Sequence, residues 1–179
     1  MKAERLMDPE ILRLARSRRG PYLAALCAPT QHQDALLALL AFDAELARIA
    51  DLVSEPMLGR IRLQWWLDAL AATKLNGGTG DHPLLGALTS LGLDVQALQC
   101  LVELHGFAFD EGVATLAQHE AQAQARGAAL AGLMLDVLGV TDETVRAAAN
   151  DVAGAWAALD AATSARRVAS LQDGEALRR

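Results

Sequence analysis

The sequence predicts an all-α protein, a bundle of helices without strands. Ala and Leu, both good helix formers, supply 37 and 32 of the 179 residues. Pro occurs five times and never after Pro83, so the last 96 residues, rich in Ala, Leu, Gln and Glu, contain none. Residues typical of strands, such as Val, Ile and Thr, are few. The length suits one domain, residues 1–179, with a sizeable core.

Cap residues mark where most of the helices are expected to begin. Asp8 followed by Pro9 is a typical N-cap and first helical position. Thr30, Asp94 and Thr141 are expected to cap later helices in the same way. The helices are expected over residues 9–18, 31–53, 57–74, 83–90, 94–109, 113–138 and 142–167.

Gly and Pro indicate where these helices end. Gly20-Pro21 is expected to break the first helix, and a short apolar segment, 22–28, follows it. Ser54-Glu55-Pro56 separates two long helices, and LNGGTGDHP, 75–83, is expected to be a solvated turn. Gly139 stops the helix before it.

Charge and hydropathy exclude several classes of protein. The net charge of −6 argues against nucleic-acid binding, because phosphate contacts need clustered Lys and Arg. No apolar run approaches the ~18–20 residues needed to cross a bilayer, and the charged start MKAERLMDPE differs from a signal peptide. Cys27 and Cys100 are predicted to be reduced core thiols in a cytoplasmic protein.

The first 19 residues carry a local positive charge. Six Lys and Arg stand against three acids there, a balance of +3. Such a segment can touch an anionic membrane surface, or it can be the solvated face of a helix. At most a peripheral contact, with the inner membrane as the candidate surface, is therefore expected.

The segment GRIRLQWWLDAL, 59–70, combines two adjacent Trp residues with an Arg. At helical spacing, an apolar face made of two neighbouring stripes is expected to surround Arg62. The stripes are Leu58, Arg62, Trp66 and Leu70, and Ile61, Trp65 and Ala69. An Arg that faces the interior needs an anionic partner. Two interpretations stay open: an internal ion pair with Asp43, Glu45 or Asp51, or an anion-binding Arg62 at the wall of an apolar cavity.

The preceding helix holds several acids. Asp51 and Glu55 are four residues apart, a spacing at which two carboxylates can share a divalent ion if the helix continues to Glu55. The alternative is that the helix ends first and Glu55 precedes the next helix N-terminus. Asp43, Glu45 and Arg48 are expected to form local pairs along the helix.

Three segments in order resemble the squalene/phytoene synthase family, closest to its bacterial branch related to a mitochondrial complex I assembly factor. They are YLAALCAP from Tyr22, ALLALLAFDAELARIADLVSEPMLGRIRLQWWLDAL from Ala35, and HPLLGAL from His82. The resemblance implies an isoprenoid-synthase-like helical bundle around an apolar cavity for prenyl chains. Active members of the family join two allylic diphosphates, using two Asp-rich motifs that bind Mg²⁺.

The sequence departs from the family pattern at both acidic motifs. Where the family has its first DDxxD, this chain has Ala47-Arg48-Ile49-Ala50-Asp51, which retains one acid and adds a positive charge. In the last long helix, Asp151 and Asp160 are nine residues apart and form no DxxxD. The chain is also shorter than family members usually are, so a C-terminally shortened bundle, completed by a second copy or a partner, is expected.

These departures favour a non-catalytic family member. It would bind a prenyl lipid, a prenyl diphosphate or a protein partner of the respiratory-complex-assembly type, or form a homodimer, with no cofactor. The ligand-binding candidates are Tyr22, Phe42, Asp43, Glu45, Arg62, Trp65 and Trp66. The alternative is an active head-to-head prenyl transferase, in which Asp51 and Glu55, with Asp43 and Glu45, would bind Mg²⁺. A third hypothesis is a structural helical domain without a ligand.

Overall fold

The all-α prediction is confirmed. The computed structural model describes residues 7–76, 82–90, 92–110 and 115–176, and these residues form helices and no strand. The helices are α1 (Pro9–Ser17), α2 (Arg19–Leu26), α3 (Thr30–Leu52), α4 (Pro56–Asn76), α5 (Pro83–Ser90), α6 (Val95–His105), the 3₁₀ helix η1 (Gly106–Phe109), α7 (Leu116–Val137) and α8 (Glu143–Ala176).

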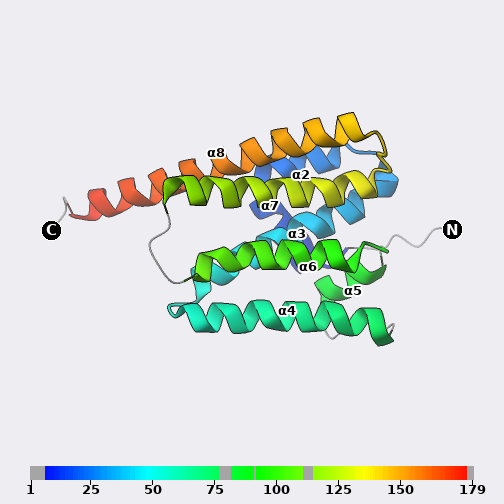
Figure 1. Ribbon diagram of the computed structural model, residues 1–179, viewed down its shortest axis with the longest axis horizontal. Helices are drawn as coiled ribbons and strands as arrows, with labels where there is room; N and C mark the ends of the chain where they lie inside the picture. The colour runs from blue at the N-terminus through cyan, green and yellow to red at the C-terminus, as the bar shows by residue number, and fades with distance from the viewer. Residues whose placement is uncertain (1–6, 77–81, 91, 111–114, 177–179) are drawn as a thin grey trace.

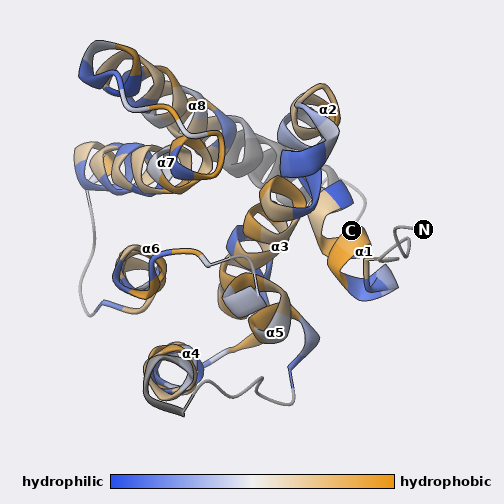
Figure 2. Ribbon diagram, turned by 90° about the vertical axis from the view of Figure 1, so that its right-hand side faces the viewer, coloured by the Kyte–Doolittle hydropathy of each residue, from blue (hydrophilic) through white to orange (hydrophobic). Residues whose placement is uncertain are grey.

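Helix α3 runs through the middle of the bundle. Viewed end-on, α1 and α2 lie on one side of it, α6 and α7 on the other, and α5 below it (Figure 2). Helices α7 and α8 run side by side, in a layer above α6 and α4 (Figure 1). Because α3 has neighbours on several sides, every residue from Ala35 to Ala44 is buried, and this stretch is apolar apart from Asp43.

The core is built around this central helix. Its largest fully buried side chains come from five helices, so one contiguous core joins the α3, α4, α5, α6 and α7 layers. They are Leu39, Leu40, Phe42, Leu46, Leu70, Leu84, Leu88, Leu98, Leu101, Val102 and Leu133. Leu and Phe have few rotamers to lose on burial, and their apolar surface supplies the main stabilising free energy of such a bundle.

Two of the predicted caps are confirmed and two are wrong. Asp8 and Asp94 accept hydrogen bonds from backbone N–H groups two residues later, at 2.8 and 3.1 Å. Thr30 is already the first residue of α3 and follows Pro29, which occupies the N-cap. At α8 it is Asp142 that accepts, from the N–H groups of Thr144 and Val145, so the cap lies one residue after Thr141.

Some helix boundaries also differ from those expected. Gly20-Pro21 does not keep the chain out of helix, because both residues fall in the first turn of α2, where Pro is tolerated. The helix predicted over 94–109 ends as an α-helix at His105 and tightens into η1. Gly139 does end α7: its φ is +70°, and the next N–H bonds to the Leu135 carbonyl, as in a Schellman motif.

The two cysteines are not core thiols. Cys27 follows the end of α2 and Cys100 lies on the outer face of α6, and both are exposed and free. The prediction rested on the general tendency of Cys to be buried. On α6, the position of Cys100 along the helix places its side chain on the outer face. Leu98, Leu101 and Val102 face the core, and Cys100 lies between them on the opposite side.

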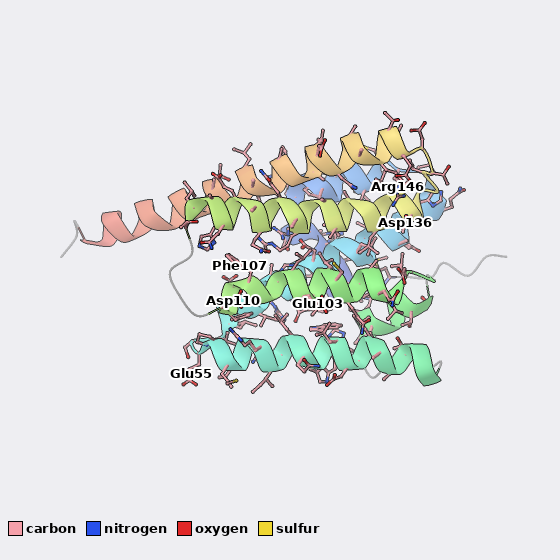
Figure 3. All side chains as sticks on the ribbon, in the orientation of Figure 1. Glu55, Glu103, Phe107, Asp110, Asp136 and Arg146 are labelled. Carbon is pink, nitrogen blue, oxygen red and sulfur yellow. The ribbon has the colours of Figure 1, made fainter. Side chains whose placement is uncertain are left out.

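Helices α7 and α8 approach very closely. A Cβ placed on Gly127 of α7 would lie 2.5 Å from the carbonyl oxygen of Ala153 and 2.7 Å from the Cβ of Ala157 on α8. One on Gly154 of α8 would lie 3.1 Å from the carbonyl oxygen of Gln124. At the other end of the pair, Arg146 bonds to Asp136 at 2.8 Å (Figure 3).

Candidate functional site

A buried ionic cluster centred on Asp43 lies inside the bundle. Asp43 is on α3, and its Oδ2 accepts a hydrogen bond from Nη2 of Arg18 at 2.5 Å. Its Oδ1 accepts one from Nε2 of His105 at 3.1 Å. Arg18 also lies 3.5 Å from Asp160 on α8. The cluster therefore connects the α1–α2 junction with α3, α6 and α8.

The partners of Asp43 hold its carboxylate in the charged form. Burial on its own would raise the pKa of Asp43, because the ion loses its hydration. The hydrogen bond from His105 and the positive charge of Arg18 outweigh this and lower the pKa from 3.8 to about 2. Asp43 is therefore an acceptor that binds two basic side chains, not an acid that can donate a proton near neutral pH.

Arg126 on α7 brings a further positive charge to this cluster. Its side chain is largely buried, and burial lowers its pKa while the charge of Asp43 raises it. Arg126 also feels the repulsion of Arg18. Asp43 thus contacts the guanidinium of Arg18 and acts through its charge on that of Arg126.

Glu45 and Arg48 form the local pair that the sequence predicts. Nη2 of Arg48 lies 2.9 Å from Oε2 of Glu45, one helical turn earlier on α3. The same prediction is wrong for Asp43, because its partners come from other helices. Arg48 lies in the segment that corresponds to the family's first acidic motif. There it pairs with the carboxylate of Glu45, where the family motif would have a further acid.

Asp51 and Glu55 do not come together as a pair on one helix. α3 ends at Leu52, Val53 is extended, and Glu55 precedes the first residue of α4. Both side chains are exposed, and Glu55 lies at the outer edge of the molecule where α4 begins (Figure 3). Across the described residues, no three His, Cys, Asp or Glu side chains are placed to hold a metal ion. Asp51 and Glu55 are thus not arranged one turn apart on a single helix, as the shared Mg²⁺ site considered above would need.

A hollow of about 210 Å³ lies between α3, α4 and the start of α5. It is lined by Glu45, Ile49, Arg62, Trp65, Trp66 and His82. The rings of Trp65 and Trp66 meet edge to face at 5.0 Å, and His82 lies 4.9 Å from Trp66. Four of the predicted ligand-binding residues, Glu45, Arg62, Trp65 and Trp66, thus lie in one place.

Arg62 does not face the interior. Its side chain is exposed, and among the described residues it forms none of the three internal ion pairs considered. The wide buried face is wrong as well, because Leu58, Ile61 and Trp65 are exposed. The buried stripe of α4 consists of Gly59, Leu63, Trp66 and Leu70. It lies partly on α6 and η1, where the Phe109 ring covers Gly59 and leaves no room for a side chain.

Tyr22 and Phe42 are not among the residues that line this hollow. Phe42 is fully buried and meets Trp66 edge-on at 5.2 Å, so it is a core residue. Tyr22 is partly buried on α2, where its hydroxyl accepts a hydrogen bond from Nε of Arg16 at 3.3 Å. Neither contact tests ligand binding, and both residues stay predictions in that respect.

Sequence reasoning missed Arg18, His105 and Arg126. Arg18 lies in a basic run that is typical of solvated helix faces, and no local pattern sets it apart. His105 carried a usable signal, since it continues the buried stripe of Leu98, Leu101 and Val102 on α6. A His on such a stripe needs a polar partner, which points to a buried acid elsewhere.

Comparison with known proteins assigns the fold to a family. The family model for squalene/phytoene synthase matches residues 14–167, most of the chain and all of the elements just described from α3 to α7. The chain belongs to the squalene/phytoene synthase family. The Asp43 cluster and the Trp65 hollow are therefore features of a squalene/phytoene synthase homologue, and its helical bundle agrees with the isoprenoid-synthase-like fold expected from the resemblance.

Two curated proteins that are similar to part of this chain are assembly factors. NADH dehydrogenase (ubiquinone) complex I, assembly factor 6, is 42% identical in Homo sapiens and 44% identical in Bos taurus, each over 45 residues. The match spans 25% of this chain and 14% of each relative. No solved structure matches significantly. No helix among the described residues is long and apolar enough to span a bilayer.

Proposed function

We propose that this squalene/phytoene synthase homologue is a non-catalytic protein that acts by binding a partner protein. The state of its acids carries the proposal. Asp43 is engaged by Arg18 and His105, and Glu45 is engaged by Arg48. A prenyl transferase needs several free carboxylates that converge on Mg²⁺, because the metal offsets the charge of the leaving diphosphate.

The curated relatives support a role with a protein partner. Their name assigns them to the assembly of NADH dehydrogenase (ubiquinone) complex I, and assembly requires contact with other polypeptides. The match covers 45 residues of this chain, and we extend a role in assembly to it as part of the proposal. A location in the cytoplasm, at most peripherally at the inner membrane, belongs to the proposal as well.

The proposal is tested by assaying pyrophosphate release. Purified protein is incubated with farnesyl or geranylgeranyl diphosphate and Mg²⁺, beside an active phytoene synthase as the positive control. No release above the protein-free background is expected. Mg²⁺-dependent release that disappears in Asp51→Ala would support the alternative, an active prenyl transferase with a relocated acid set.

Arg126 favours a second candidate, the binding of a prenyl diphosphate without turnover. A partly buried guanidinium whose pKa is lowered by burial and by the charge of Arg18 favours a nearby anion, and a diphosphate group is a strong one. Calorimetric titration with farnesyl diphosphate would then show binding that weakens at least tenfold in Arg126→Ala. Binding of equal strength to the variant would contradict this candidate.

A further inference from the structure

The first half of α4 presents a cluster of exposed apolar side chains. Four of them fall within an arc of about 100° around the helix, given its 3.6 residues per turn, and a fifth comes from the end of α3 just before it. They are Met57, Leu58, Ile61 and Trp65, with Leu52. We call these five residues the α4 face. Single exposed apolar residues are ordinary, but a contiguous patch with a polar rim marks a binding surface.

The hollow lined by Trp65 lies beside the α4 face, and we call it the recess. Ile49 and Trp66 supply apolar wall, and the half-exposed Trp65 stands at its border with the α4 face. Its volume of about 210 Å³ is below the ~300–1,000 Å³ of pockets that enclose drug-sized ligands. The recess therefore suits one inserted side chain better than a whole prenyl chain.

The charged residues around the recess indicate which polar group of the partner could bind beside the inserted side chain. Glu45 is neutralised by Arg48, and Arg60 is occupied by the Phe109 carbonyl at 2.8 Å and by Asp110. Arg62 is exposed at the rim of the recess and has no ion pair within the described residues. A carboxylate on the partner would form an ion pair with Arg62, through the two parallel hydrogen bonds that a guanidinium favours.

Exposed charges near this face argue against an anionic membrane as its occupant. Exposed acids, Asp51, Glu55 and Asp68, surround the α4 face and would repel an anionic membrane. A polypeptide segment can instead place a single acid on Arg62 and keep the surface that faces Asp51, Glu55 and Asp68 free of negative charge.

We propose that the α4 face and its recess dock a segment of a partner protein that inserts an apolar side chain beside Trp65 and places a carboxylate on Arg62. This inference rests on the proposed function, for which it names the surface and the chemistry of the partner. Trp and Arg are among the side chains most enriched in the residues that dominate binding free energy at interfaces, and here Trp65 and Arg62 line the same recess.

A random peptide library displayed on phage is the probe. Peptides selected on the full chain are expected to share an acid next to a large apolar residue. Their affinity, measured by fluorescence anisotropy, is expected to fall at least tenfold in Arg62→Glu and in Trp65→Ala. Replacing the peptide's acid with Lys should restore binding to Arg62→Glu, which a merely structural effect would not do.

Two matched variants serve as controls. Arg19→Glu reverses an exposed charge on α2, and Trp156→Ala removes an exposed Trp on α8. Both are expected to leave peptide affinity unchanged within twofold. Circular dichroism of all four variants should show the wild-type helix content, so that loss of binding is not loss of fold.

Several outcomes would overturn the inference. Selection that enriches no binder, or binders insensitive to Arg62→Glu and Trp65→Ala, would remove the α4 face as the docking surface. So would binding to mixed phosphatidylcholine and phosphatidylglycerol vesicles, or a dimer in sedimentation velocity, if either were lost in Trp65→Ala. Binders lost in Trp156→Ala alone would move the surface to α8 and keep the binding role. Pyrophosphate release would instead contradict the proposed function and leave the peptide result standing.

Discussion

At the scale of single residues, Trp66 is 4% exposed and packs edge-on against Phe42, while Trp65, one position earlier, is 49% exposed. Neighbours on a helix point about 100° apart, so one falls in the core and the other on the surface. Trp66→Ala is expected to lower the free energy of unfolding by about 3–5 kcal/mol. Trp65→Ala should lower it by less than about 1 kcal/mol. Urea unfolding followed by circular dichroism measures both, and equal losses would contradict this assignment of the faces.

Asp43 is the residue on which the ionic cluster depends. Asp43→Ala leaves Arg18 and His105 without their carboxylate inside the bundle, and breaking a buried pair in this way costs about 3–5 kcal/mol. Asp51→Ala, on the same helix but exposed, serves as the control and should change stability by less than about 0.5 kcal/mol. Similar unfolding midpoints for the two variants would show that the cluster does not stabilise the fold.

At the scale of elements, the contact of α7 with α8 depends on Gly127. Gly127→Ala would push a methyl group against the Ala153 carbonyl and force the helices apart, at a cost of about 1–3 kcal/mol. Gly132→Ala, on the same helix with no atom within 4 Å of its new Cβ, should instead stabilise by about 0.5–1 kcal/mol through helix propensity. Opposite shifts in the melting temperature are therefore expected, and shifts of the same sign would contradict the close approach.

Most of the elements were predictable because their signals are local. Asp8-Pro9 and Asp94 start helices through contacts within two residues, and Gly139 ends one through its own backbone. The ionic cluster was not predictable, because Asp43 and His105 are 62 positions apart and meet only in the folded bundle. The lining of the hollow was predictable in part, because Arg62 stands out among apolar residues beside the two Trp residues. The exposure of Arg62 and Trp65 was not predictable, because it depends on how α4 packs against the other helices.

For the molecule as a whole, the cluster ties the N-terminal helices to the rest of the bundle. Arg18 lies between α1 and α2, and its guanidinium reaches both α3 and α8. A family member without catalysis, as proposed above, can use its carboxylates and guanidiniums for such links. The stability of the fold would then depend on the charge of Asp43, which changes with pH.

The stability of the whole molecule should therefore fall in acid in a way that Asp43 controls. The folded-state pKa of Asp43, about 2, is below the 3.8 of the free group, so its contribution is complete above about pH 4 and is lost as the pH falls through 2. That difference corresponds to about 2 kcal/mol. Urea unfolding of the wild type and Asp43→Asn should differ most at pH 5–7 and converge by about 2 kcal/mol towards pH 2. Because the other acids titrate alike in both proteins, a stability difference that stays constant with pH would show that Asp43 is not held ionised by Arg18 and His105.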